Sequence, residues 1–179
     1  MIDKSVIHWF PMRVTYNREL KIKKQLDKLG IESYIPMRYA IDEDNNDIRR
    51  EIVPAIHNLI FVHASQETIT NLKMTKKEFE PLRYIMRRHL EDLRLEIITV
   101  EDKKMNDFIR VASDEKAKYL DMSDYIKAKG KRVRVIGGKF EGIEGVVKRI
   151  HGNKHVVIAL EDIAAIGFMC LPAILLEIK

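Results

Sequence analysis

Four cationic side chains are spaced so that they share one side of a helix. Arg18, Lys21, Lys24 and Lys28 lie on the side that faces away from the apolar residue Ile22. A row of cations at this spacing can follow a phosphate backbone, which gives affinity for nucleic acid without a choice of sequence. A solvated helix face has the same pattern, so the residues alone leave both interpretations open.

Residues that could carry out catalysis are not grouped in any known pattern. The sequence contains no GxSxG, Walker A, GxGxxG or HExxH motif. His151 and His155 have the spacing of a metal pair on a helix, but they lie in a glycine-containing turn without a cysteine or acidic partner. We therefore expect a protein that is not an enzyme and that uses no metal and no other cofactor.

The positive charge of the chain lies at its C-terminal end. Residues 127–179 hold ten Lys and Arg against five Asp and Glu, which leaves 22 of each sign (32 − 10 and 27 − 5) in residues 1–126. The single cysteine, Cys170, cannot form an internal disulfide, and the N-terminus has no signal-peptide pattern. The longest apolar run, residues 163–176, is interrupted by Gly167 and Pro172 and is shorter than the ~18 residues of a membrane helix. We expect a cytoplasmic protein that does not enter a membrane.

The N-terminal part alternates between strand and helix patterns. Strands are predicted at residues 9–16, 33–41, 48–55, 58–63 and 83–88, and helices at 17–29, 66–74 and 99–112. Asn17 is the expected N-cap of the first helix and Gly30 its stop. Pro11 places the first strand at a sheet edge or a bulge. This order predicts an α+β fold in which helices pack on one face of an antiparallel sheet.

The pattern changes in the C-terminal third. Residues 113–129 are polar and lack an apolar period, whereas short strands with glycine turns follow them. We expect an N-terminal domain at 1–112, a linker at 113–126 and a small SH3-like β-barrel at 127–179. The alternating valines favour strands over a helical hairpin in this last domain.

A glycine-punctuated stretch at residues 130–145 resembles the KOW motif. Two glycines allow a tight turn, a phenylalanine supplies an apolar anchor, and two further glycines permit positive φ or a close approach of strands. These residues are Gly137, Gly138, Phe140, Gly142 and Gly145. The motif also occurs in ribosomal proteins, so it indicates transcription or translation without choosing between them.

Stretches of the N-terminal half resemble the N-terminal domain of NusG transcription factors. They are Trp9-Phe10, Arg18-Glu19-Leu20, Ile35-Pro36-Met37 and residues 54–62. Residues 13–21 are most similar to the specialised RfaH and UpxY-type members. His57, where the family usually has proline, is a departure from the pattern.

The resemblance implies which residues meet RNA polymerase. An apolar depression would hold the clamp helices, and the start of the second helix would meet the gate loop. The matching positions are Phe10, Ile56, Leu59 and Phe61 for the clamp helices, and Thr68 and Thr70 for the gate loop. The apolar residues can also be ordinary core, and the threonines can be helix-terminal hydroxyls without a partner.

The implied function is transcription antitermination. By resemblance, the protein would bind RNA polymerase as a monomer and promote processive transcription of one operon, such as one for capsular polysaccharide. The helix cations would contact the non-template DNA strand or nascent RNA, and the KOW domain would recruit a ribosomal protein or another partner. An RNA-binding or ribosome-associated module and a general housekeeping NusG are the alternatives.

Overall fold

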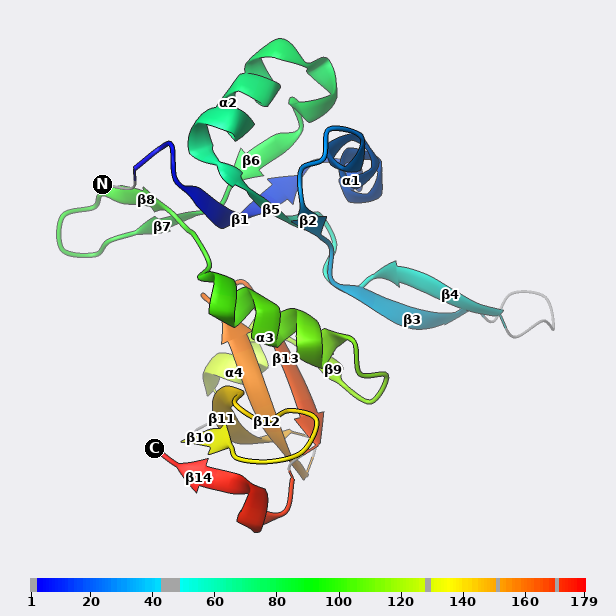
Figure 1. Cartoon of the computed structure of the whole chain (residues 1–179), viewed down its shortest axis with the longest axis vertical. Coiled ribbons are helices and arrows are strands. Elements are labelled where there is room, and N and C mark those ends of the chain that lie inside the picture. Colours follow the sequence, from blue (N-terminus) through cyan, green and yellow to red (C-terminus); the bar gives the residue numbers. More distant parts are fainter. Residues whose placement is uncertain (1–2, 43–48, 128–129, 151, 170) are drawn as a thin grey trace. The chain divides into compact units, whose positions relative to one another are not determined.

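The chain folds into two compact units. The computed structural model describes residues 3–42, 49–127, 130–150, 152–169 and 171–179. Its contacts separate a first unit, Met1–Glu101, from a second unit, Asp102–Lys179. Both units combine helices with antiparallel strands (Figure 1), which confirms the predicted α+β class.

A four-stranded antiparallel sheet forms the centre of the first unit. Its order is β2-β5-β1-β6, with bounds Ser33–Tyr34, Leu59–Ser65, Ile7–Val14 and Leu82–Tyr84. Pro11 lies in β1, where it pairs with Phe61 of β5. On the other side of β1, pairing with β6 begins only at Met12. The proline therefore sits where β1 is locally an edge, and its missing N–H costs no ladder bond.

The helices of the first unit pack on one face of this sheet. α1 (Glu19–Lys28) buries Ile22 and Leu26, and α2 (Gln66–Thr75) buries Ile69. A 3₁₀ turn, η2 (Lys77–Phe79), adds Phe79 to the same core. These side chains pack with Phe10 and other residues that alternate along β1 and β5.

The expected N-cap of α1 at Asn17 is wrong. Arg18 occupies the cap position and makes no side-chain cap hydrogen bond, while Asn17 has a positive φ of 51°. The backbone N–H of Asn17 instead donates to Oδ1 of Asn58 at 3.0 Å. The chain has to turn sharply between β1 and α1, and that turn takes Asn17 out of the extended conformation that a cap requires. Gly30, with a φ of 67°, follows the helix as expected.

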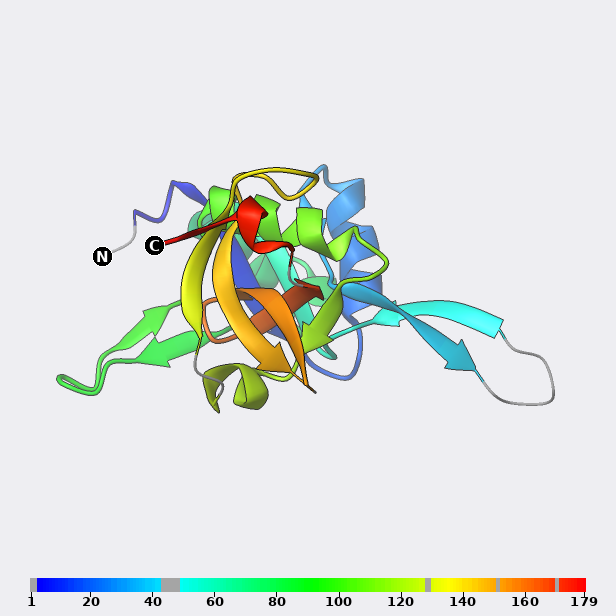
Figure 2. The same cartoon turned by 90° about the horizontal axis from the view of Figure 1, so that it is seen from below.

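Two hairpins extend from the first unit (Figures 1 and 2). One joins β3 (Met37–Asp42) to β4 (Arg49–Pro54), and the other joins β7 (Met86–Arg88) to β8 (Leu95–Ile97). The expected strand at 33–41 is thus divided into β2 and β3, and the expected strand at 83–88 into β6 and β7. In both places the chain leaves the main sheet to enter a hairpin.

The second unit is built on a six-stranded antiparallel sheet. Its order is β14-β10-β11-β12-β13-β9, with bounds Leu176–Ile178, Lys131–Val135, Glu144–Ile150, Asn153–Leu160, Ala164–Met169 and Lys118–Leu120. α3 (Asp102–Ala112) lies against β12 and β13, α4 (Met122–Lys127) follows β9, and a 3₁₀ turn, η3 (Ala173–Leu175), precedes β14. The predicted strands of the C-terminal part are thus present, and the segment at 163–176 contributes β13.

The division between the units falls one helix earlier than the sequence pattern suggests. Arg110 of α3 donates to the carbonyl oxygen of Glu141 at 3.0 Å, and Lys104 pairs with Glu161 at 3.2 Å. These contacts hold α3 in the second unit, whereas the sequence prediction assigns it to an N-terminal domain ending at 112. The segment expected as a linker contains β9 and α4. Its apolar residues are too few to show a period, but backbone pairing with β13 still orders β9.

Candidate polymerase and nucleic-acid interface

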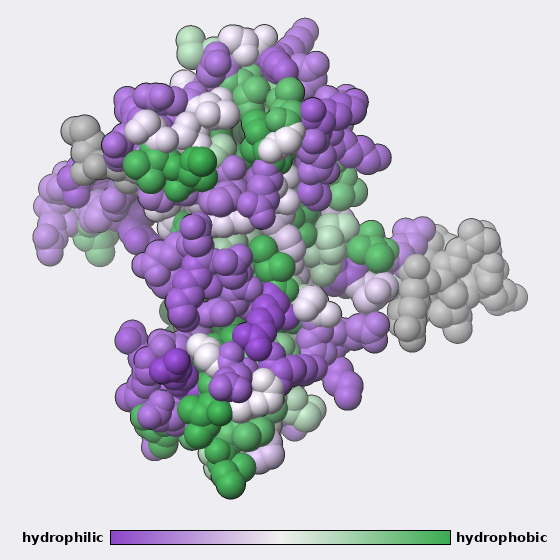
Figure 3. All heavy atoms as spheres, in the orientation of Figure 1, coloured by the Kyte–Doolittle hydropathy of each residue, from purple (hydrophilic) through white to green (hydrophobic). Residues whose placement is uncertain are grey.

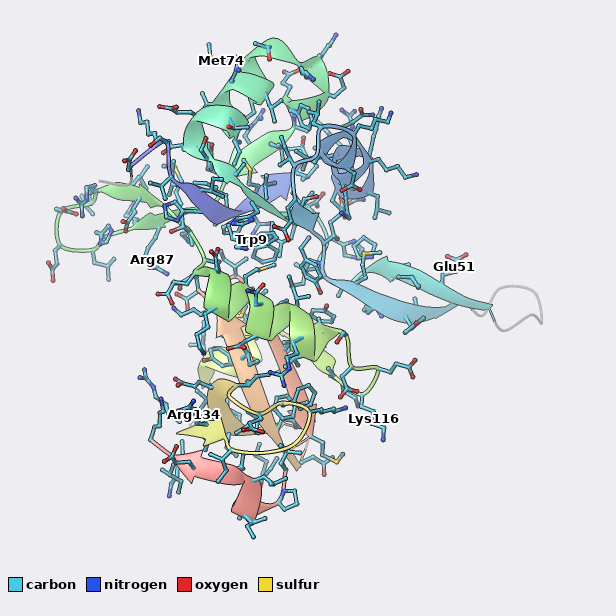
Figure 4. All side chains as sticks on the ribbon, viewed as in Figure 1. Trp9, Glu51, Met74, Arg87, Lys116 and Arg134 are labelled. Atoms are coloured by element: carbon cyan, nitrogen blue, oxygen red, sulfur yellow. The ribbon has the colours of Figure 1, made fainter. Side chains whose placement is uncertain are left out.

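The central sheet of the first unit is apolar on both faces. Pairing places Trp9 opposite His63 and Pro11 opposite Phe61 on one face, with Leu59 further along it. We call this the Trp9 face. Figure 4 shows Trp9 on the side of β1 that faces away from α2. A sheet with two apolar faces needs a cover on each, and the described helices of this unit contribute to the other face.

Phe10 belongs to the helix-covered face and not to the Trp9 face. It is opposite Val62, it is completely buried in the core, and its ring lies edge-on to Tyr84 with 5.6 Å between centroids. The structure therefore separates Phe10 from Leu59 and Phe61, which the resemblance grouped with it. A partner on the Trp9 face would not touch Phe10.

The Trp9 face combines apolar side chains with a series of polar contacts that runs from Trp9 through His63 to Glu32. The rings of Trp9 and His63 stack with centroids 4.6 Å apart and planes 6° from parallel. Nδ1 of His63 lies 2.7 Å from a carboxylate oxygen of Glu32. Leu59 and Phe61 are buried in the chain. Ile56 precedes β5 in a bend and is half-buried, so of the expected clamp-binding residues only Leu59 and Phe61 share this face.

A polar cluster ties the start of α1 to the start of β5. Asn58, with a φ of 61°, accepts a hydrogen bond from the N–H of Val14 at 2.9 Å through its backbone oxygen. Its own N–H donates to Oε1 of Glu19 at 3.3 Å, and Glu19 is buried. These bonds, with the one from Asn17 to the Asn58 amide, fix α1 relative to the strands that carry the Trp9 face. The sequence signal was the family-like Arg18-Glu19-Leu20, but a buried acid could not be foreseen from it.

The cations of α1 form an exposed row. Arg18, Lys21, Lys24 and Lys28, which we call the α1 row, are all exposed. Lys24 and Lys28 lie on the side of α1 away from the buried Ile22, whereas Arg18 is one turn before Ile22 and lies on the same side as that residue. Among the described residues none of the four makes a salt bridge, whereas the neighbouring Lys23 does so with Asp27 at 3.0 Å. The row therefore has the geometry that phosphate binding needs.

Sequence reasoning missed an aromatic residue beside this row. Tyr16 is 81% exposed, and the guanidinium carbon of Arg18 lies 5.3 Å from the centre of its ring. A positive φ of 64° projects it from the turn before α1. An exposed aromatic ring next to cations is a platform on which a nucleic-acid base can stack. The signal in the sequence was the tyrosine in residues 13–21, but only the turn shows that its ring faces solvent.

The two threonines of α2 have local partners. Ser65 caps the helix by accepting a hydrogen bond from the Thr68 N–H at 3.1 Å, and its Oγ lies 2.9 Å from Oγ1 of Thr68. A side-chain hydrogen bond links Thr70 to Tyr84, and burial raises the pKa of the Tyr84 phenol while this bond lowers it. The hydroxyls are thus not without partners, but both residues are exposed at one end of α2 and can meet another surface.

The KOW-like loop of the second unit turns on glycines and packs on a phenylalanine. Gly142 has a φ of 85°, and a Cβ added at Gly145 would lie 2.8 Å from the carbonyl oxygen of Val157. Phe140 is buried, and its ring centroid lies 4.1 Å from that of Phe168 in β13. Gly137 and Gly138 precede it in the same loop. Larger side chains at 142 or 145 would strain the turn or push β11 from β12.

These features define an α+β protein whose distinctive residues lie on surfaces suited to binding. Among the residues that the structure describes, no three histidine, cysteine or acidic side chains gather as a metal site. The described helices include none that is both long and apolar enough to cross a membrane.

The chain belongs to the NusG family. Its residues 7–109, more than half of the sequence, match the family model described as "Transcription termination factor nusG". No curated protein matches the sequence. The family consists of non-enzymatic transcription factors that interact with RNA polymerase, so this chain is a transcription elongation or antitermination factor in that general sense.

Proposed function

We propose that the protein is an antitermination factor that binds the clamp helices of RNA polymerase through the Trp9 face. The observation that carries this proposal is the second apolar face of the central sheet, which includes Leu59 and Phe61. Apolar surface of this kind gains about 25 cal/mol per Å² when a partner covers it. Holding the clamp closed favours the elongating state through differential affinity and needs no chemistry.

Two further contacts complete the proposed complex. The end of α2 that carries Thr68 and Thr70 meets the gate loop, so that the protein bridges the polymerase cleft. The α1 row contacts the non-template DNA strand, with a base stacked on Tyr16. The partner of the second unit, a ribosomal protein or another factor, is a separate contact.

Two phenylalanines on opposite faces of one sheet provide the test. Phe61→Ala and Phe10→Ala remove the same ring from fully buried sites in neighbouring register positions. Each substitution lowers the free energy of unfolding by about 3–5 kcal/mol. We expect Phe61→Ala to weaken capture by immobilised clamp helices at least tenfold more than Phe10→Ala does, after correction for the folded fraction measured by circular dichroism. Equal capture of both folded variants would contradict the assignment of the Trp9 face.

Operon-specific action is proposed from the resemblance of residues 13–21 to the specialised members. A general housekeeping factor would act on most transcripts, so transcript profiles of a strain that lacks the gene separate the two. Loss of distal transcripts from a single operon supports the specialised function. Changes across the genome support the general one.

A further inference from the structure

The second unit contains a hollow that the polymerase proposal does not use. Its volume is about 770 Å³, and it lies between β10, β11, the start of β12, the end of β13 and β14. The KOW-like loop joins β10 to β11, and none of its residues 136–143 lines the hollow. Hollows of this size accommodate a few side chains or a small ligand.

The floor of the hollow is aliphatic. Val133, Val147 and Leu176 line it, and Met169 and Ile178 form a lip that is 67% and 68% exposed. Figure 3 shows hydrophobic side chains gathered at the end of the molecule where η3 and β14 lie. Exposed apolar residues of this kind next to a hollow indicate a contact surface.

The rim of the hollow is cationic. Lys131, Arg149 and Lys154 line it, and among the described residues none of the three makes a salt bridge. Arg149 and Lys154 are direct cross-strand partners in β11 and β12. Like charges in directly opposed positions destabilise a sheet, so the fold alone gives no reason for this pair.

The described residues that line the hollow include no Asp or Glu, and the two acidic residues of the surrounding strands are Glu144, which pairs with Lys179, and Glu177. Residues 125–140, 145–160 and 163–176 contain no Asp or Glu. A fourth cation, Lys148, is already engaged, because it donates to the Tyr125 carbonyl oxygen and its ammonium lies 3.9 Å from the centre of the Tyr125 ring. The remaining cations are therefore available to a ligand that is anionic.

The shape and chemistry favour a peptide over a nucleic acid. Single-stranded nucleic acids are bound by aromatic rings on which the bases stack, and the described lining residues include no aromatic side chain. Aliphatic floors with charged rims are typical of grooves that take apolar anchors from a protein segment.

We propose that this hollow binds a protein segment in which aliphatic residues alternate with carboxylates. The aliphatic side chains enter between Val133, Val147 and Leu176, and the carboxylates pair with Arg149 and Lys154. The contact is independent of polymerase docking, because it uses neither the Trp9 face nor α1.

Fluorescence anisotropy on the full-length protein tests this proposal. The probe is a short labelled peptide that alternates leucine and glutamate, and the comparison probes are its lysine counterpart and labelled oligouridine. We expect the acidic peptide to bind in preference to both. Reversing the rim with Arg149→Glu/Lys154→Glu should weaken binding about tenfold, and Met169→Glu should weaken it as well.

A matched variant controls for net charge. Lys118→Glu/Arg132→Glu also reverses two exposed cations of the second unit, but at positions that do not line the hollow, and it should bind the acidic peptide as the wild type does. Failure of the wild type to bind the acidic peptide overturns the proposal. Preferential binding of oligouridine, or equal losses in the rim and control variants, also overturns it.

Discussion

The two units present their recognition residues in opposite ways. In the first unit, the apolar Trp9 face and the cationic α1 row are on different elements, and the apolar part is buried. In the second unit, apolar and cationic side chains line a single hollow that is open. Separate surfaces suit a bridge between two distant targets, whereas a combined surface suits one short segment. The difference suggests that a large assembly meets the first unit and a peptide meets the second.

The largest expected effect that distinguishes the two units is a loss of stability on substitution of Phe140. Phe140→Ala removes a buried ring that packs on Phe168, at a cost of about 3–5 kcal/mol in unfolding free energy. Hydrogen exchange should accelerate in β10 to β13 and remain unchanged in β1 and β5. Equal acceleration in β1 would mean that the units unfold together, and the comparison would then fail.

A smaller effect is expected where α1 joins the sheet of the first unit. Asn58→Ala removes the amide that accepts from Asn17 and places alanine at a φ of 61°. Together the two changes lower the free energy of unfolding by about 1–2 kcal/mol. Chemical denaturation measures it, and Asn58→Gly, which tolerates the backbone conformation, should lose less. If the glycine variant loses as much, backbone strain contributes nothing and the side-chain bond accounts for the whole effect.

Substitutions in the α1 row should weaken binding of nucleic acid and leave binding of the acidic peptide unchanged. Lys21→Ala/Lys24→Ala/Lys28→Ala should reduce the slope of log affinity against log salt by about 2, because each phosphate contact with a single strand contributes about 0.7. Titrations of labelled single-stranded DNA over a range of salt concentrations measure the slope. The acidic peptide should still bind this variant normally.

Alanine at three exposed lysines elsewhere, Lys4, Lys76 and Lys116, provides the control for this experiment. This triple variant removes the same charge and should reduce the slope of log affinity against log salt much less. An equal reduction in both variants would show that net charge, and not the α1 row, binds the strand.

The smallest effect is a gain of stability in the second unit. Arg149→Thr removes the repulsion with Lys154 and places a good strand former in β11, which should stabilise the protein by about 0.2–1 kcal/mol. The same change should weaken binding of the acidic peptide. Thermal unfolding and anisotropy measure the two effects, and a variant that is less stable would show that Arg149 has a structural role.

Local patterns in the sequence predicted most of the fold. The period of Ile22 and Leu26 gave the buried side of α1, and the spacing of glycines around Phe140 indicated the turn between β10 and β11. These features depend on neighbours along the chain. The expected strand at 48–55 contains β4, and only its first residue lies outside the described residues.

What the sequence could not supply depends on distant contacts. Phe10 and Phe61 are both apolar strand residues, and only the pairing register shows that they face opposite sides. α3 has an amphipathic pattern that fits either unit, and its place follows from ion pairs and hydrogen bonds such as Lys104 with Glu161. The hollow of the second unit is formed by five consecutive strands, and no local motif shows which of their side chains converge on it.

The stack of Trp9 on His63 turns the proposed docking face into its own reporter. Trp9 is the single tryptophan of the chain, so all indole emission comes from this position. Binding of a partner to this face changes the surroundings of the ring and therefore the wavelength and intensity of its fluorescence. Docking on the face can thus be followed in real time without a label, with a tryptophan-free peptide as the partner.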